Sequence, residues 1–230
     1  MKPASPSRSV EEHGFAIISG VFSAEFLDQA LGEMSRLAPQ RSRAGVRHAL
    51  RLAPVAKIAR CPQLTSLAAD VLGPAAFPYR ATLFEKTSSA NWLVVWHQDT
   101  ALPLRERQEI PGWGPWSIKE GVTYAHAPAS ALSQVLALRI HFDDSTRDNG
   151  PLRVLPGTHN RGVLKDEEID ELSGKLPAVD CVVEKGGVVA MRPLLVHASS
   201  KLLNEKPRRV LHIEYAASQF IAAPLQLAIA

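Results

Sequence analysis

The stretch VLALRIHFD, residues 135–143, alternates apolar and polar side chains. Successive side chains of a β-strand point to opposite faces, so this stretch predicts a strand with two unlike faces. The polar face carries Arg139, His141 and Asp143. The apolar face carries Leu136, Leu138, Ile140 and Phe142.

Three further segments repeat this pattern of period two: YRATLFEK (79–86), LVVWHQD (93–99) and RRVLHIEY (208–215). An antiparallel sheet with one solvated face explains such alternation. A barrel or jelly roll with a polar lumen explains it equally well. Apolar spacing of helical period precedes the strands at 23–38, where Ser23 is the expected N-cap, and at 62–73, which ends at Gly73. Helices first and strands later predict an α+β fold.

The length of 230 residues predicts a single domain over 1–230. We expect a polar N-terminal tail over about residues 1–12 and a possible lid in the long loop 101–134. The net charge of +3 is scattered and favours no nucleic-acid partner. No apolar run predicts a membrane span or a signal peptide. Cys61 and Cys181 stand in unrelated contexts and need not pair, so the expected location is the cytoplasm.

A candidate metal site begins in WLVVWHQDT, residues 92–100. His97 and Asp99 share one face of the strand, with Cα atoms about 6.5 Å apart. His197 ends the apolar run VVAMRPLLVH (188–197) in the same manner, and it is the expected third ligand. Two histidines and one carboxylate form the facial triad of non-heme Fe(II) oxygenases, although zinc accepts the same ligands in hydrolases.

Arg208, eleven residues after His197 in the run KPRRV, is the expected partner of a carboxylate. A guanidinium binds a carboxylate with two parallel N–H donors, which suits the distal carboxylate of 2-oxoglutarate. Arg209 is the rival. Strand parity favours Arg208, because Arg208 shares the polar face with His212 whereas Arg209 shares the apolar face with Leu211.

The chain resembles the phytanoyl-CoA dioxygenase family of Fe(II)/2-oxoglutarate oxygenases. The resemblance is carried, in the family's order, by LFEK (83–86), WHQD (96–99), DNGPLRVLPGTH (148–159), GGVVAMRPLLVHASS (186–200) and PRR (207–209). It implies a double-stranded β-helix core of the jelly-roll, cupin-like type with flanking N-terminal helices. It also implies iron bound by His97, Asp99 and His197, and 2-oxoglutarate bound by Arg208, Ser199 and Thr82.

The activity that this resemblance implies is that of a dioxygenase dependent on Fe(II), 2-oxoglutarate and O2. Such an enzyme hydroxylates a small-molecule metabolite and releases succinate and CO2. The alternative is a cupin-type hydrolase or isomerase that uses the same metal site without 2-oxoglutarate. We expect Arg139, His141, Lys86 and Phe84 to line the substrate pocket. Arg139 stands where some family members carry an aromatic residue, so a phytanoyl-CoA substrate is not implied. No oligomeric state follows from the sequence.

Overall fold

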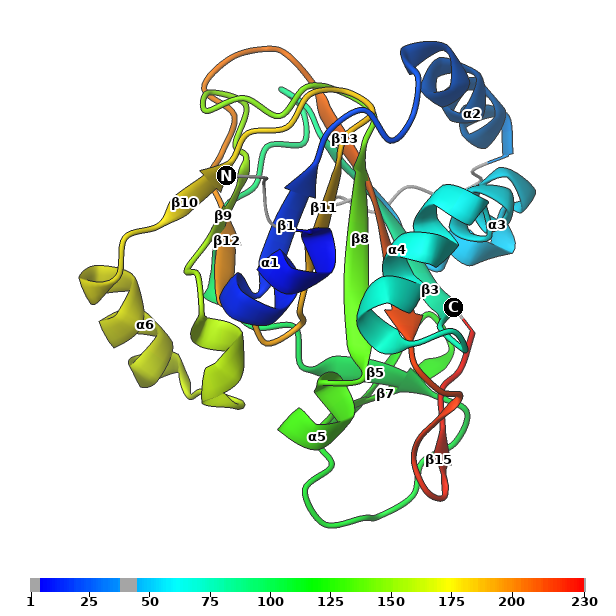
Figure 1. Cartoon of the computed structure of the whole chain (residues 1–230), viewed down its shortest axis with the longest axis vertical. Coiled ribbons are helices and arrows are strands. Elements are labelled where there is room, and N and C mark those ends of the chain that lie inside the picture. Colours follow the sequence, from blue (N-terminus) through cyan, green and yellow to red (C-terminus); the bar gives the residue numbers. More distant parts are fainter. Residues whose placement is uncertain (1–4, 38–44, 230) are drawn as a thin grey trace.

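The computed structural model describes residues 5–37 and 45–229, and its helices flank a body of antiparallel strands (Figure 1). The helical segments are α1 (Pro6–His13), α2 (Ala24–Leu37), η1 (Ala49–Arg51), α3 (Ala53–Ala59), α4 (Pro62–Leu72), α5 (Ala129–Leu132), η2 (Thr158–Arg161) and α6 (Asp166–Lys175). Both expected helices are confirmed as α2 and α4. The backbone N–H of Phe26 donates to Ser23 Oγ at 3.2 Å, and Gly73 follows the last turn of α4.

Two larger sheets form the body of the molecule, and every strand pair in them is antiparallel. The six-stranded sheet has the order β1 (Phe15–Ile18), β11 (Val188–Met191), β8 (Val135–His141), β13 (Arg208–Ala216), β3 (Phe77–Lys86) and β2 (Gly45–Val46). The four-stranded sheet has the order β10 (Val179–Cys181), β9 (Leu152–Val154), β12 (His197–Ser199) and β4 (Val94–His97).

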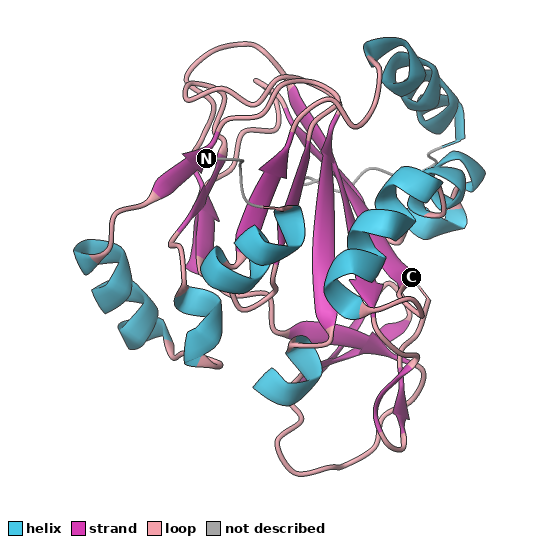
Figure 2. Ribbon diagram, in the orientation of Figure 1, coloured by secondary structure: helices cyan, strands magenta, loops and turns pink. Residues whose placement is uncertain are grey.

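The helices cover one face of the six-stranded sheet, as Figure 2 shows for α1 and α4. The apolar side chains of β8 and β13 pack there against Val10 of α1, Leu27 of α2, Val55 of α3 and Leu64 of α4. The opposite face packs on the four-stranded sheet through a smaller apolar cluster that includes Val189 and Val154. The alternating polar residues therefore face the space between the two sheets rather than solvent. This is the double-stranded β-helix of the cupin-like class, which confirms the α+β prediction.

The expected polar tail over residues 1–12 is wrong for the part that the structure describes. Residues 6–13 form α1, whose N-cap is Ser5, with the Arg8 N–H donating to Ser5 Oγ at 3.3 Å. Val10 is fully buried among the helices, so a single apolar residue fixes an otherwise polar helix to the core. Residues 1–4 lie outside the described part of the chain.

The segment 101–134 is not the open loop that its composition suggested. It holds the three-stranded sheet β5 (Ala101–Leu104), β7 (Val122–His126) and β6 (Trp116–Lys119), followed by α5. Leu102, Leu104 and Trp113 are buried in a cluster with residues of β14 (Phe220–Ala222) and β15 (Leu225–Gln226). The short strands and the prolines hid the period-two pattern.

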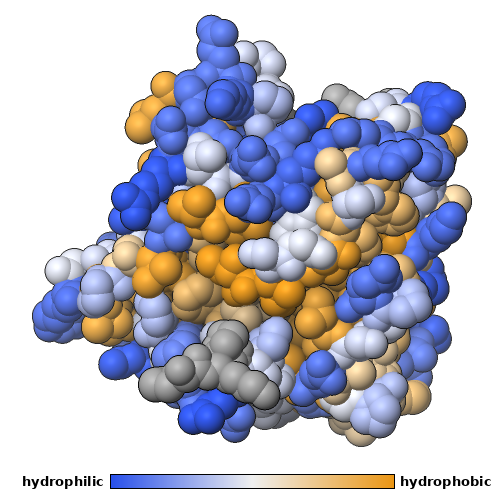
Figure 3. All heavy atoms as spheres, turned by 45° about the horizontal axis from the view of Figure 1, so that its top comes forward, coloured by the Kyte–Doolittle hydropathy of each residue, from blue (hydrophilic) through white to orange (hydrophobic). Residues whose placement is uncertain are grey.

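The described helices are all too short or too polar to cross a lipid bilayer. Figure 3, a space-filling view in which the top of Figure 1 is tilted toward the reader, shows hydrophilic residues over much of the visible face, around an apolar strip.

Candidate metal and co-substrate site

Two paired strand ends bring the three expected ligands together. β4 ends at His97, β12 begins at His197, and these two residues are opposite each other in the antiparallel pair. Their ring centroids are 4.2 Å apart. Asp99 follows two residues after His97, and its backbone N–H donates to Pro193 O at 2.9 Å. This bond holds the carboxylate beside both imidazoles.

The ligand atoms of His97, Asp99 and His197 converge on one point. His97 Nε2 lies 3.7 Å from Asp99 Oδ1, and His197 Nε2 lies 3.6 Å from Asp99 Oδ2. One ligand atom from each residue lies within 4.8 Å of the other two. His197 is buried, whereas His97 and Asp99 are about one-third exposed, so the group is open on one side.

Backbone carbonyls select the ring nitrogen that each histidine presents. Nδ1 of His97 lies 2.9 Å from Val95 O, and Nδ1 of His197 lies 2.9 Å from Leu195 O. A carbonyl only accepts, so each Nδ1 carries a proton and Nε2 is the ring nitrogen turned toward the metal position. Burial lowers the pKa of His197 to about 4, although Asp99 opposes this shift, so the ring is neutral at pH 7.

Asp99 supplies the negative charge of the group. Burial acts to raise its pKa, but His197, His97, His212 and Arg80 outweigh burial and hold the pKa below its usual range. Two imidazoles and one carboxylate, with an open side, form the donor set that suits Fe(II). The residues present therefore fit a mononuclear iron site.

Arg208 lies in the same cavity with its guanidinium buried. Its Nη2 donates to Ser199 Oγ at 3.0 Å and its Nε to Asn149 O at 3.3 Å. No carboxylate of the described residues pairs with it. Arg209 differs, because its Nε and Nη2 donate to the two oxygens of Asp143 at 2.7 and 2.5 Å. The parity argument thus identified the arginine that faces the lumen.

A cavity of about 170 Å³ connects the triad to Arg208. The expected co-substrate residues Ser199 and Thr82 line it. Three of the four expected substrate residues also line it, namely Arg139, Lys86 and Phe84.

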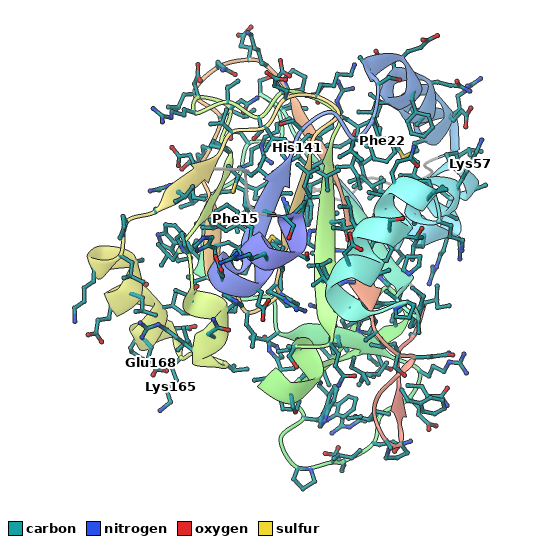
Figure 4. All side chains as sticks on the ribbon, in the orientation of Figure 1. Phe15, Phe22, Lys57, His141, Lys165 and Glu168 are labelled. Carbon is teal, nitrogen blue, oxygen red and sulfur yellow. The ribbon has the colours of Figure 1, made fainter. Side chains whose placement is uncertain are left out.

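His141 does not line the cavity, so its expected place in the pocket is wrong. It lies on the inner face of β8, as parity predicted, but it is fully buried near the upper end of the strand in Figure 4. Neither ring nitrogen has a hydrogen-bond partner among the described residues. Burial, with Arg139 and Arg208 nearby, lowers its pKa well below the usual value, so the ring is neutral. Strand parity predicts which face of a strand a residue lies on. It does not predict how far along the strand the space between the two sheets remains open.

Arg80 and Trp92 are among the cavity residues that the sequence analysis missed. Arg80 lines the cavity and forms a buried ion pair with Glu214 of β13, while Tyr79 Oη lies 3.4 Å from the same carboxylate. Arg80 shares the strand face of Thr82, so parity could have found it. Trp92 also lines the cavity, but it precedes its strand and no periodic pattern marks it.

A double-stranded β-helix with a two-histidine, one-carboxylate group defines the class of cupin-like non-heme iron enzymes. Solved structures of this class share the fold of this chain at low identity. The carbocyclase SnoK of nogalamycin biosynthesis superposes with a TM-score of 0.70 at 16% identity, covering 97% of this chain and 85% of SnoK. The epimerase SnoN, in complex with Fe3+, alpha ketoglutarate and nogalamycin RO, superposes with a TM-score of 0.69 at 16% identity, covering 98% of this chain and 94% of SnoN.

The family model of phytanoyl-CoA dioxygenase (PhyH) matches residues 10–210. The chain belongs to this family. It is 26% identical to L-proline trans-4-hydroxylase of Streptomyces griseoviridis over 186 residues, which cover 70% of this chain and 62% of the hydroxylase. It is 34% identical to the peroxisomal phytanoyl-CoA dioxygenase of Rattus norvegicus over 92 residues, 34% of this chain and 26% of the rat protein. The matches thus span less than two thirds of either relative.

Proposed function

We propose that the chain is a non-heme dioxygenase dependent on Fe(II) and 2-oxoglutarate that hydroxylates a small molecule. In this proposal His97, Asp99 and His197 bind the iron. Arg208 binds the distal carboxylate of 2-oxoglutarate, and Ser199 and Thr82 border the co-substrate.

The observation that carries the proposal is that one cavity holds both the metal-ligand triad and Arg208, an arginine without a carboxylate partner among the described residues. A buried guanidinium without an anion is unfavourable, so the burial of Arg208 without a carboxylate partner supports an anionic ligand. 2-Oxoglutarate matches both ends of this cavity. Its 2-oxo acid group chelates a metal, and its distal carboxylate requires a cation. The alternative, a hydrolase or isomerase with the same triad, leaves Arg208 without a role.

When bound, iron and 2-oxoglutarate supply the oxidising chemistry, in which 2-oxoglutarate and O2 yield succinate and CO2 while a substrate C–H bond is hydroxylated. The chain positions these partners. Gln98, between two of the ligands, donates from Nε2 to Gly162 O and Leu194 O at 2.9 and 2.7 Å and accepts from the Leu164 N–H at 2.8 Å. These three bonds fix the strand end that carries His97 and Asp99. Phe84 and Leu152 give the cavity apolar walls that limit access of water.

We extend the proposal to a small-molecule substrate and a cytoplasmic location. The small cavity volume and the match to a proline hydroxylase support the substrate class. The location is supported by Cys61 and Cys181, which are both free, as expected in a reducing compartment.

An anaerobic titration tests the proposal. Fe(II) and then 2-oxoglutarate are added to the purified chain, and a weak visible charge-transfer band is expected only when both are present. The Arg208→Met variant should bind Fe(II) but need far more 2-oxoglutarate to develop the band. Admission of O2 to the wild-type mixture should release succinate. Tight metal binding without a band and without succinate would favour the hydrolase or isomerase.

A further inference from the structure

A small cluster of cations lies beside the metal site, around the ring of Tyr124. Arg80 of β3 lines the cavity, and its Nη1 donates at 3.2 Å to Ala101 O, two residues beyond Asp99. Its Cζ lies 5.6 Å from the ring centroid of Tyr124 on β7. Lys119 Nζ, at the end of β6, lies 5.0 Å from the same centroid. Two cations from different sheets therefore meet at one aromatic ring.

The hairpin of β6 and β7 fixes the position of Lys119. Glu120 and Gly121 join the two strands with φ values of 50° and 80°, the pattern of a two-residue type I′ turn. The turn places Lys119 opposite Val122, and residues opposite each other in a strand pair share a face. Val122 also shares its face with Tyr124, two residues further along β7. Lys119 and Tyr124 are thus held on one face of a short, well-defined hairpin.

The cluster carries more positive charge than its ion pairs balance. Glu214 pairs with Arg80, but no ion pair joins Lys119 or Arg47 to a carboxylate of the described residues. Burial lowers the pKa of Lys119, and the charges of Arg80 and Arg47 add to this shift, whereas Asp99 opposes it. Lys119 therefore lies within electrostatic reach of a metal ligand and has no anion of its own.

His48 borders the same ring and has no hydrogen-bond partner. Its ring meets Tyr124 edge-on, with centroids 6.3 Å apart, and only 4% of the residue is exposed. Neither ring nitrogen has a partner among the described residues. Its backbone is left-handed, with φ of 52°, which is unfavourable for a residue other than glycine. Backbone strain and unused buried polar atoms of this kind gather at ligand-binding sites.

The cavity is too small to hold the co-substrate and a second molecule. Its volume of about 170 Å³ is below the roughly 300 Å³ at which ligand pockets begin, and the proposed 2-oxoglutarate spans it from the triad to Arg208. The molecule that is hydroxylated must therefore extend beyond the cavity, past the partly exposed ligands His97 and Asp99. Lys119 does not line the cavity, but it shares an aromatic contact with Arg80, which does.

We propose that Lys119 and Arg80, both against Tyr124, bind an anionic group of the molecule that is hydroxylated. This inference rests on the proposed function, and it defines the substrate class as small molecules that carry a carboxylate or a phosphate group. Lys119 contributes a compact charge without a partner, and Arg80 contributes a planar fork held by its own ion pair. An anion bound there holds the neighbouring C–H bonds beside the iron ligands.

The competing explanation is that Lys119 is an ordinary exposed lysine that covers an aromatic ring. Such a lysine would attract no anion to the neighbourhood of the iron. A lysine of a substrate site would hold an anion close to the iron even when 2-oxoglutarate already occupies the triad and Arg208. The distance between a bound anion and the iron therefore separates the two explanations.

The experiment measures how strongly Fe(II), a paramagnetic ion, broadens the NMR lines of small anions held near it. The anaerobic full chain is loaded with Fe(II), desalted and saturated with 2-oxoglutarate. The probes are ¹³C-labelled acetate and inorganic phosphate, with acetamide and trimethyl phosphate as their neutral matches. The proteins are wild type, Lys119→Met and Lys119→Glu, with Lys57→Met as the control. Lys57 is an exposed lysine of α3, labelled in Figure 4, and its loss matches the change in net charge of Lys119→Met.

In the wild type at least one anion should be broadened, and neither neutral molecule should be. Lys119→Met should reduce the broadening about threefold to tenfold, as for loss of one charge-assisted contact at an exposed site, and Lys119→Glu should remove it. Lys57→Met should match the wild type. The anion that is broadened more identifies the group as a carboxylate or a phosphate.

Two results would overturn the proposal. One is a wild type that broadens neither anion. The other is equal broadening in the wild type and Lys119→Met, which would indicate an anion bound directly to the iron. The proposed function fails separately, and this inference with it, if the wild type develops no charge-transfer band with Fe(II) and 2-oxoglutarate.

Discussion

At the scale of single residues, the site is organised by contacts that each ligand makes with its own strand. His97 and His197 each bind the carbonyl two residues earlier, at Val95 and Leu195. A strand residue and its second predecessor lie on the same side, so this bond needs no partner from elsewhere in the fold. The same local geometry, repeated on two paired strands, points two Nε2 lone pairs at one place.

We predict that His97→Ala and His197→Ala each abolish Fe(II) binding and turnover without unfolding the protein. Each change removes one of three ligands, while the ring that it removes bonds only to a nearby carbonyl. Iron content after desalting and the circular dichroism spectrum provide the measurement. His126→Ala is the control, because His126 bonds to Thr100 outside the triad. Full iron content in either triad variant would contradict the assignment.

The neighbouring arginines should behave differently when each is replaced by methionine. Arg208→Met should weaken 2-oxoglutarate by about 2–3 kcal/mol, roughly thirtyfold to a hundredfold or more, because a charge-assisted paired contact is lost. Arg209→Met should leave this affinity unchanged and lower the melting temperature, because it leaves Asp143 without its partner. Calorimetric affinities and thermal melts measure both effects. A larger loss of co-substrate affinity in Arg209→Met would reverse the assignment.

At the scale of elements, strand parity was the most informative property of the sequence. It identified the inner face of β13, with Arg208 and His212, because a slip by one residue would turn buried apolar groups to the lumen. It could not identify the depth of the lumen, so His141 was placed in the pocket although it is buried beyond it. Short elements such as α1, which bury one or two residues, lack enough periodic positions to be recognised.

Helix α1 supplies an element-scale prediction through Val10. Val10→Ala should lower the free energy of unfolding by about 1–2 kcal/mol, because it removes two fully buried methyl groups from the main cluster. Ser9→Ala should also destabilise the protein, because the Ser9 hydroxyl donates to Phe15 O at 2.9 Å and joins α1 to β1. Denaturant unfolding measures both changes. A Val10→Ala protein as stable as wild type would show that α1 does not hold to the core in solution.

The segment 101–134 should behave as a fixed sheet with one exposed connection. β5 and β7 pair over four residues, and Leu104 and Trp113 are buried, whereas most of residues 105–112 are exposed. Limited proteolysis should therefore cut within 105–112, at a rate that Fe(II) and 2-oxoglutarate do not change. Protection of this connection by the two ligands would instead support the mobile lid that its length and composition suggested.

At the scale of the whole molecule, the two sheets enclose a concentration of positive charge. Arg80 has Glu214 as its partner, but Lys86, Arg139 and Arg208 have no carboxylate partner among the described residues. Arg139 instead bonds from Nη1 to His212 Nδ1 at 2.8 Å and lies 5.6 Å from the centroid of Phe84. The cavity thus holds buried cations without a paired carboxylate, which is consistent with the anionic co-substrate of the proposed function.

This charge distribution predicts how 2-oxoglutarate affinity depends on pH. In the protein without ligand, burial lowers the pKa of Lys86 to about 7, and the charges of Arg208 on β13 and Arg139 on β8 add to this effect. The other groups that face Lys86, Ser199 of β12 and Trp92, are neutral. A bound carboxylate favours the ammonium form and raises this pKa. Binding above pH 7 must therefore take up a proton, and affinity must fall as pH rises, by at most about tenfold per pH unit.

Below pH 7 the lysine is already charged, so affinity should become independent of its titration. Burial also lowers the pKa of Arg208, to about 9, which is above that of Lys86, so Lys86 titrates first as the pH rises. Calorimetry of the anaerobic Fe(II) protein, in buffers of different ionisation enthalpy, measures both the affinity and the protons taken up. Lys86→Arg is the matched control, because it keeps the charge, the iron ligands and any titration of iron-bound water, and it should lose the uptake. Equal proton uptake in wild type and Lys86→Arg would show that a group other than Lys86 titrates.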